Sequence, residues 1–178
     1  KAIHSVIFYD FEGKIYDEQD VIHGEDAIVP VNPEYFQHVF IGWNQDLSNI
    51  TENIAVYPIF EPLLHEVIFL DDNDEVFDMI KVLDATKIIY PEHHPEKEGY
   101  SFIGWSVSYQ TWINDNTIVY PIFEPKTYTL VFFDHDGELF TTRSGAYQEE
   151  IIYPVGPYLE GYNFERWDYN QTYFSENK

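Results

Sequence analysis

The sequence predicts a β-rich α+β fold built from three small modules in tandem, and three observations support this prediction. The run Val-Tyr-Pro-Ile-Phe-Glu-Pro at 56–62 returns 63 positions later at 119–125. Short apolar runs rich in β-branched and aromatic residues are followed by turns rich in Asp, Asn and Gly, which is the pattern of β-hairpins. The 14 Phe, 15 Tyr and 4 Trp supply bulky side chains that can fill small cores.

Each module is expected to open with a hairpin, because an apolar run leads into an acidic turn and an apolar pair follows. The opening strands are predicted at 6–9, 67–70 and 130–133. The segment after each return strand fits either a short helix or an irregular crossover, and this segment is the α part of the predicted fold class.

The second half of each module combines a proline-ended apolar run with an aromatic strand. The pattern Gly-Tyr-x-Phe-x-x-Trp is complete at 99–105 and 161–167 and partial in the first module. Alternating aromatic residues place one face of a strand in a core. A closing strand ends the first two modules. The predicted modules are 1–62, 63–125 and 126–178, and the closing strand of the third is missing, so we expect a segment of a longer protein.

These motifs resemble the Listeria–Bacteroides repeat, the B-repeat type of module in internalin B and other bacterial surface proteins. The likeness rests on the opening strand at 127–132, the Asp-Gly turn at 136–137 and the Gly-Tyr-Ser-Phe-Ile-Gly-Trp run at 99–105. The closing strands depart from the family, which often ends in Ala-x-Trp. The resemblance implies small β-grasp-like modules, with no catalytic residues to carry over. Because the linkers between modules are short, we expect an elongated rod.

The charge excludes some partners. Against 32 acidic residues stand 9 Lys and Arg, and the formal net charge of −23 repels nucleic acid and anionic lipid. The absence of cysteine excludes disulfides and thiolate chemistry. No apolar run is long enough for membrane insertion. The usual nucleophile, phosphate-loop and zinc-protease motifs are absent, so an enzyme is not expected.

One set of residues recurs at the same place in each module and is interpreted as the structural core of the repeat. These residues are Trp43, Trp105, Trp167, Phe40, Phe102, Phe164, Gly42 and Gly104. Exposed aromatics can also dock a partner, but recurrence at one position is explained more simply by packing.

Two other sets are candidate binding residues. The acidic turns could offer oxygen ligands to Ca²⁺, although hairpin turns use the same residue types and no EF-hand pattern is present. The metal candidates are Asp71, Asp72, Asp74, Asp134 and Asp136. No other cofactor is expected. Trp112 has no aromatic counterpart in the first module, and it is the predicted partner contact together with Tyr109.

The predicted function is a non-catalytic, surface-exposed stalk, spacer or adhesive module of a larger bacterial surface protein. Repetition would add avidity to weak contacts with a protein or with a host or envelope surface. Two alternatives stay open. One is a phage virion protein, such as a capsid decoration, head fiber or tail accessory that forms a homo-oligomer. The other is an accessory module of a secreted enzyme. The expected location is extracellular, at the cell surface or on a virion.

Overall fold

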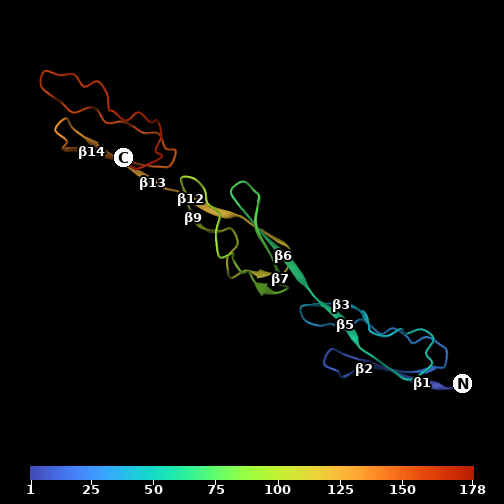
Figure 1. Cartoon of the computed structure of the whole chain (residues 1–178). Coiled ribbons are helices and arrows are strands. Elements are labelled where there is room, and N and C mark those ends of the chain that lie inside the picture. The colour runs from blue at the N-terminus through green and yellow to red at the C-terminus, as the bar shows by residue number, and fades with distance from the viewer. The chain divides into compact units, whose positions relative to one another are not determined.

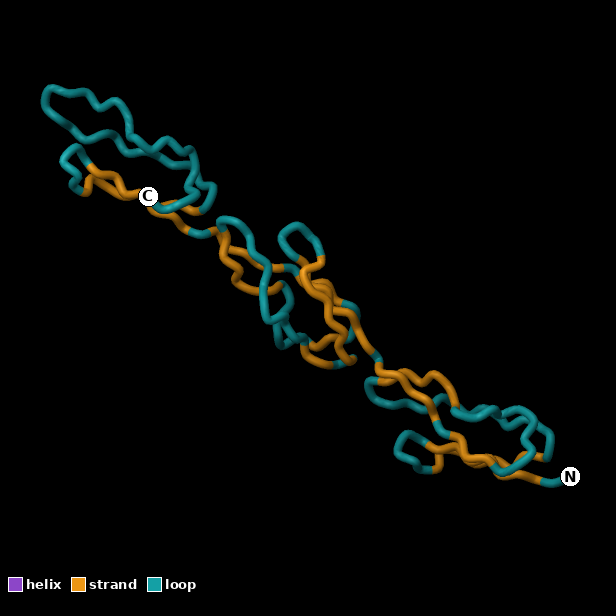
Figure 2. The backbone as a smooth tube through the Cα atoms, in the orientation of Figure 1, coloured by secondary structure: helices purple, strands orange, loops and turns teal.

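The computed structural model describes residues 1–178 and contains strands and no helix (Figure 2). The β-rich part of the prediction is confirmed, and the α part is wrong. The segment after the first return strand is an irregular crossover. There the side-chain amide of Gln19 donates to the Ile28 carbonyl and accepts from the Ile28 N–H, at 2.7 and 2.9 Å. These bonds hold the backbone extended, and β-branched residues before a proline disfavour a helix. The β-grasp-like arrangement stays a prediction.

The chain divides into two compact units, and the division falls within the second predicted module. The first consists of Lys1–Val67, Ile80–Ile88 and Gln110–Thr117, and the second of Ile68–Met79, Ile89–Tyr109 and Ile118–Lys178. The first unit therefore contains the whole of the first predicted module, and the second unit contains the whole of the third.

The first predicted module has two small sheets. In the three-stranded sheet, β1 lies between β2, which is antiparallel to it, and β4, which is parallel to it. In the other sheet, β3 and β5 pair antiparallel. The strands are β1 (Ile3–Tyr9), β2 (Ile15–Ile22), β3 (His38–Trp43), β4 (Ile54–Val56) and β5 (Pro58–Pro62).

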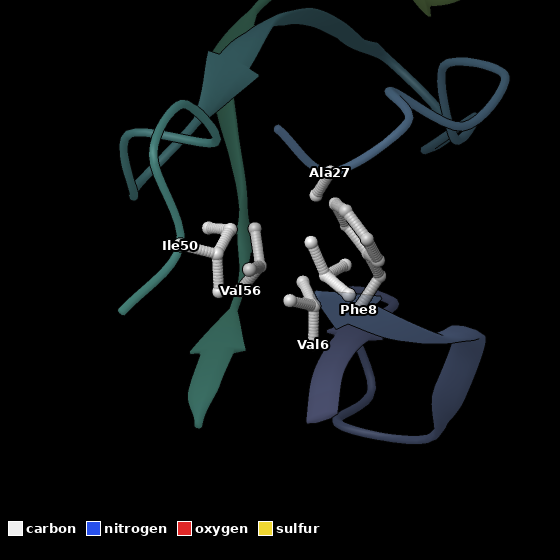
Figure 3. Packing of buried hydrophobic residues seen from close by; sticks show 6 residues of the cluster. Val6, Phe8, Ala27, Ile50 and Val56 are labelled. Carbon is white, nitrogen blue, oxygen red and sulfur yellow. The ribbon is translucent and has the colours of Figure 1, made fainter. Parts of the chain in front are cut away.

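The core of this module sits on the face of β1 that points away from solvent. Val6, Phe8 and Val56 are fully buried, and Ala27 and Ile50 close the core from the loops (Figure 3). Because alternate residues of β1 point to one face, Val6 and Phe8 enter the core together. The core is made entirely of apolar side chains drawn from distant parts of the module.

The second predicted module repeats this order of strands. Its three-stranded sheet has the order β11-β6-β7, and two-stranded sheets join β8 to β10 and β9 to β12. The strands are β6 (Leu64–Leu70), β7 (Val76–Leu83), β8 (Thr86–Lys87), β9 (Tyr100–Trp105), β10 (Trp112–Ile113), β11 (Thr117–Val119) and β12 (Pro121–Pro125).

The third predicted module has one hairpin, β13 (Thr127–Phe133) with β14 (Leu139–Ala146), and no further strand (Figure 1). Its core is formed by Leu130, Phe132, Ile151 and Phe174. The aromatic run at 161–167, which matches β3 and β9 in sequence, is irregular here. A strand needs a hydrogen-bonded neighbour, and the partners of β3 and β9 are the closing strands β5 and β12.

Two half-buried tyrosines, Tyr90 and Tyr153, are expected to make the fold sensitive to alkali. Burial raises the pKa of Tyr90 and of Tyr153, with neighbouring Tyr109 and Tyr169 as the second causes. The Tyr90 hydroxyl donates to the Val107 carbonyl, a bond that ionisation would remove. The folded pKa lies above the unfolded value of about 10. The stabilisation is therefore complete below about pH 10 and is lost as the pH rises through the folded pKa.

We therefore expect the free energy of unfolding, measured by chemical denaturation, to fall as the pH rises above about 10. Tyr90→Phe should flatten this dependence. Tyr158→Phe, at a position that is 87% exposed, is the matched control and should leave it unchanged. If the free energy of unfolding fell equally steeply with pH in Tyr90→Phe and in the original chain, Tyr90 would not be the source of the sensitivity to alkali.

Candidate functional site

The acidic hairpin turns owe their shape to hydrogen bonds within each turn. In the second module, an Asp71 side-chain oxygen accepts from the backbone N–H groups of Asn73 and Glu75, at 2.8 and 3.0 Å. Asp134 does the same for Asp136 and Glu138, both at 3.0 Å. The side chain of the first Asp in each turn therefore organises the backbone, which is the ordinary role of Asp in turns.

The metal candidates differ in how closely they gather. Ligand atoms of Asp134, His135 and Asp136 lie within 4.8 Å of one another, and His135 was not among the predicted ligands. Asp72 and Asp74 are exposed in their turn, and Asp74 has a φ of 61°. In the turn of the second module, Asp71 already accepts hydrogen bonds from backbone N–H groups. Ca²⁺ binding at either turn stays a prediction.

The recurring aromatic residues form a repeated edge-to-face contact. The ring centroids of Phe8 and Trp43 are 5.0 Å apart, those of Phe69 and Trp105 are 5.0 Å apart, and those of Phe132 and Trp167 are 4.8 Å apart. Trp105 is buried, and Trp43 and Trp167 are half-buried. Edge-to-face pairs of this kind stabilise a fold by more than the burial of their surface area alone would.

The phenylalanines of the same motif are placed less uniformly. Phe40 and Phe102 are half-buried, whereas Phe164 is 46% exposed because no closing strand lies beside it. Gly42 and Gly104 lie next to shifts in strand register, where φ is 155° and 152°. Such irregularities favour glycine, and Arg166 stands at the matching place in the third module.

Trp112 projects from a short strand pair at the surface of the first unit. It is 58% exposed, whereas its neighbour Ile113 is 1% exposed and anchors the strand in the core. The Ala85 N–H donates to the Ile113 carbonyl at 2.8 Å. The Lys87 ammonium lies 5.6 Å from the centre of the Trp112 ring, which places a cation over an exposed aromatic face. Tyr109, 63% exposed, belongs to the second compact unit.

The structure reveals an equivalent of Trp112 that the sequence interpretation missed. The Ile50 N–H donates to the Glu25 carbonyl at 2.8 Å, and the Phe174 N–H donates to the Glu149 carbonyl at 2.9 Å. Ile50 and Phe174 are buried in their own cores, as Ile113 is. The residues just before them are therefore equivalent: Asn49, Trp112 and Tyr173. Tyr173 is 52% exposed. Aligning the buried residue that follows each position would have found it.

The junction between successive modules is braced by backbone hydrogen bonds. In the first unit, the Leu63 N–H donates to the Gln37 carbonyl and the Asp84 N–H to the Leu63 carbonyl, both at 2.8 Å. The Gln37 side chain also donates to the Asp84 carbonyl at 2.6 Å. His65 bonds to the Asp84 carboxylate at 2.8 Å.

The second unit contains the same brace with different side chains. The Lys126 N–H donates to the Gly99 carbonyl and the Tyr147 N–H to the Lys126 carbonyl, both at 2.8 Å. Gly99 takes the place of Gln37, and the Tyr147 ring lies against it. The backbone connection is therefore conserved within the chain, whereas the side chains that surround it change.

Surface hydrogen bonds account for two further shifts in pKa. The N–H and hydroxyl of Ser48 donate to Asp46 and hold the pKa of that carboxyl below its usual value. The hydrogen bond to Glu12 raises the pKa of Lys14. Both groups lie on the surface, and each interaction shapes a turn.

The succession of strands and the recurring Phe–Trp contact describe one structural unit that occurs repeatedly. The family model of the Listeria-Bacteroides repeat domain matches residues 4–57, 65–121 and 128–177. The chain belongs to the Listeria-Bacteroides repeat family. The resemblance seen in the sequence is thereby confirmed, and the three matched segments are called the first, second and third repeats below. The boundaries 1–62, 63–125 and 126–178 stay predictions.

The chain is similar to parts of longer proteins. Two proteins of Evansella cellulosilytica are named as membrane proteins, one of them as Gly-rich, and they are 25% and 26% identical over 93% of this chain. Internalin H of Listeria monocytogenes is 32% identical over 47% of the chain. The chain spans 21%, 28% and 17% of the lengths of these three relatives.

A solved structure, Mub-RV, covers 70% of this chain at 12% identity, with a TM-score of 0.19. The structure of this chain contains no helix that is long and apolar enough to cross a membrane.

Proposed function

We propose that the chain is a non-catalytic repeat segment of a larger bacterial surface protein, where it serves as a spacer that also contacts a protein partner. One observation carries the proposal. The three repeats keep the Phe–Trp pair and a buried apolar residue at the position of Ile113. They vary the residue that projects outward just before it, which is Asn49, Trp112 or Tyr173. A repeat that serves as a scaffold is expected to keep its core residues. A repeat that makes its own contacts is expected to differ from the other repeats at surface positions.

The chemistry of the varied position favours a protein contact. Tryptophan and tyrosine have an apolar ring and a polar edge, and both are enriched where protein interfaces form. The backbone at Trp112 pairs with β8, and the backbone at Tyr173 forms a bridge to Glu150, which limits the conformational entropy lost on binding. The formal charge of −23 favours a partner with a basic or neutral surface over nucleic acid.

The names of the relatives agree with a location at a membrane or cell surface. Two relatives are named membrane proteins and a third is an internalin. Each is much longer than this chain, so a spacer or adhesive role concerns one part of such a protein. The short braces between repeats suit a spacer, because each repeat begins without a flexible linker.

Surface display tests the proposal. Cells that display the chain should adhere to at least one of a panel of surfaces coated with purified extracellular proteins. The double variant Trp112→Ala, Tyr173→Ala should adhere about tenfold less, which corresponds to about 1.4 kcal/mol. Phe36→Ala, at a position that is 72% exposed, is the matched control and should adhere normally.

Adhesion that survives loss of both aromatics would contradict the contact role of this position. If no coated surface is bound, the adhesive role fails and the spacer role can be tested alone. In that case, a tag at Lys1 should become more accessible to antibody as the displayed chain grows from one repeat to three.

A further inference from the structure

The second compact unit has an open pocket beside the brace that joins the second and third repeats. Its volume is about 740 Å³, and all of the residues that line it belong to this unit. The second repeat supplies the run at 94–102, the connection supplies Phe123 and Lys126, and the third repeat supplies Tyr128, Tyr147 and Ser175. The pocket is therefore built where one repeat passes into the next.

Two lysines of this pocket have no acidic partner. None of the ion pairs of the chain involves the ammonium group of Lys97 or of Lys126. The chain has 32 acidic residues against 9 Lys and Arg, so acidic groups are abundant, and Glu96 and Glu98 line the same pocket. Unpaired positive charge in these surroundings favours an anionic ligand.

Lys97 is positioned by aromatic rings. It is half-buried, and its ammonium lies 4.8 Å from the centre of the Tyr100 ring and 5.8 Å from the centre of the Phe123 ring. Cation–π contacts of this kind hold an ammonium in place and leave its charge available to an anion. Partial burial strengthens the attraction between that charge and an anion, because less water screens it.

The first repeat has a tyrosine where the second has Lys97. The two residues are Tyr35 and Lys97, and each lies two positions before the residue whose carbonyl takes part in a brace. The Tyr35 ring stacks on the His38 ring, with centroids 4.1 Å apart. An uncharged ring therefore occupies this place in the first repeat, whereas an ammonium occupies it in the second.

The residues of the brace change in the same direction. Lys126 takes the place of Leu63, which adds a positive charge. Tyr147 takes the place of Asp84, which removes the carboxylate that bonds to His65 in the first brace. The second brace is therefore suited to an anion in a way that the first is not.

The rest of the lining suits the ring of a sugar. Tyr128 and Tyr147 contribute aromatic rings, against which the C–H face of a sugar can pack. Glu98 stands where the first repeat has Phe36, so it offsets one of the added positive charges, but its carboxylate can accept hydrogen bonds from sugar hydroxyls. Ser101 adds a hydroxyl that can donate or accept.

We propose that this pocket binds a glycan that contains a uronic acid. The carboxylate of the sugar pairs with the ammonium groups of Lys97 and Lys126, and its ring packs against Tyr128 and Tyr147. Hydrogen bonds between an ammonium and a carboxylate are stronger than those between neutral groups, so the two lysines select the acidic sugar. The pocket contains neither of the aromatic residues that carry the proposed function, so the two proposals are independent.

An acidic peptide suits the pocket less well, because Glu96 and Glu98 line it too. A peptide rich in Asp and Glu would bring several carboxylates close to these two, and like charges repel. A uronic acid has one carboxylate, and its hydroxyls can donate hydrogen bonds to the glutamates.

Isothermal titration calorimetry of the full chain at low ionic strength tests the ligand class. At least one of two probes, the tetrasaccharides of hyaluronan and of polygalacturonate, should bind saturably with a Kd below about 1 mM. Chitotetraose, a neutral sugar of the same length, and tetraglutamate, an acidic peptide, should each bind at least about tenfold more weakly. Absence of binding by both acidic sugars would overturn the proposal. Equal binding of chitotetraose would overturn the role of the carboxylate, and equal binding of tetraglutamate would overturn the choice of a glycan.

Variants of the two lysines test the place of binding. Lys97→Gln and Lys126→Gln should each weaken binding of the acidic sugar at least about fivefold. Lys14→Gln in the first repeat, where the side chain is 74% exposed, changes the net charge equally and should leave binding unchanged. Lys126 takes part in the brace through its backbone, so hydrogen exchange near 99 and 147 should stay the same in Lys126→Gln. Equal weakening by all three variants, or by none, would overturn the assignment to this pocket.

Discussion

Phe8→Ala is expected to lower the free energy of unfolding of the first repeat by about 3–5 kcal/mol. Phe8 is fully buried near the end of β1 and packs edge-on against Trp43 at a centroid distance of 5.0 Å. Removing the ring loses its transfer free energy and leaves a cavity that the other core residues, fixed on separate strands, cannot fill. The core of one repeat is small, so this loss is a large part of its stability.

Hydrogen exchange at β1 and β2 amides measures this effect on the first repeat by itself. Val31→Ala, at a position that is 82% exposed, is the matched control and should change stability by less than about 0.5 kcal/mol. If Phe8→Ala and Val31→Ala destabilised the repeat equally, the edge-to-face pair would not be the centre of the core.

Gly99→Ala is expected to destabilise the brace between the second and third repeats by about 2–5 kcal/mol. Gly99 has a φ of +77°, and a Cβ placed on it would lie 2.2 Å from the Tyr147 ring. The left-handed backbone costs an alanine about 1–2 kcal/mol, and forcing the ring away adds about 1–3 kcal/mol. Gln37 shows that this position accepts a side chain at a φ of 60° where Asp84 replaces the tyrosine.

Gly161→Ala separates the cost of the left-handed backbone from the cost of the steric clash with a ring. Gly161 has a φ of +79° and no atom within 4 Å of a Cβ, so its substitution should cost only the backbone term of about 1–2 kcal/mol. The double variant Gly99→Ala, Tyr147→Ala should be less destabilised than the sum of its single variants, because the clash is absent. Chemical denaturation followed by hydrogen exchange near 99 and 147 provides the measurement. Equal losses for Gly99→Ala and Gly161→Ala would contradict the clash.

The sequence by itself determined the three repeats, their family, and the opening hairpin of each repeat with its turn. These features depend on local chemistry. Alternating apolar residues such as Val6 and Phe8 define a buried strand face, and Asp10, Asp71 and Asp134 each organise a turn through bonds to residues two and four positions on. The residues that determine a strand face or a turn therefore lie within a few positions of one another in the sequence.

The tertiary structure decided which copies of a repeated residue are buried and which are exposed. Phe40, Phe102 and Phe164 share one motif, yet Phe164 is the most exposed of the three because its environment depends on a strand distant in sequence. The equivalence of Trp112 and Tyr173 depends on the burial of Ile113 and Phe174, which make matching backbone hydrogen bonds in their repeats. Of the two predictions for the segment after each return strand, a short helix or an irregular crossover, the helix is wrong. Strand burial is set by long-range pairing, which local propensity does not encode.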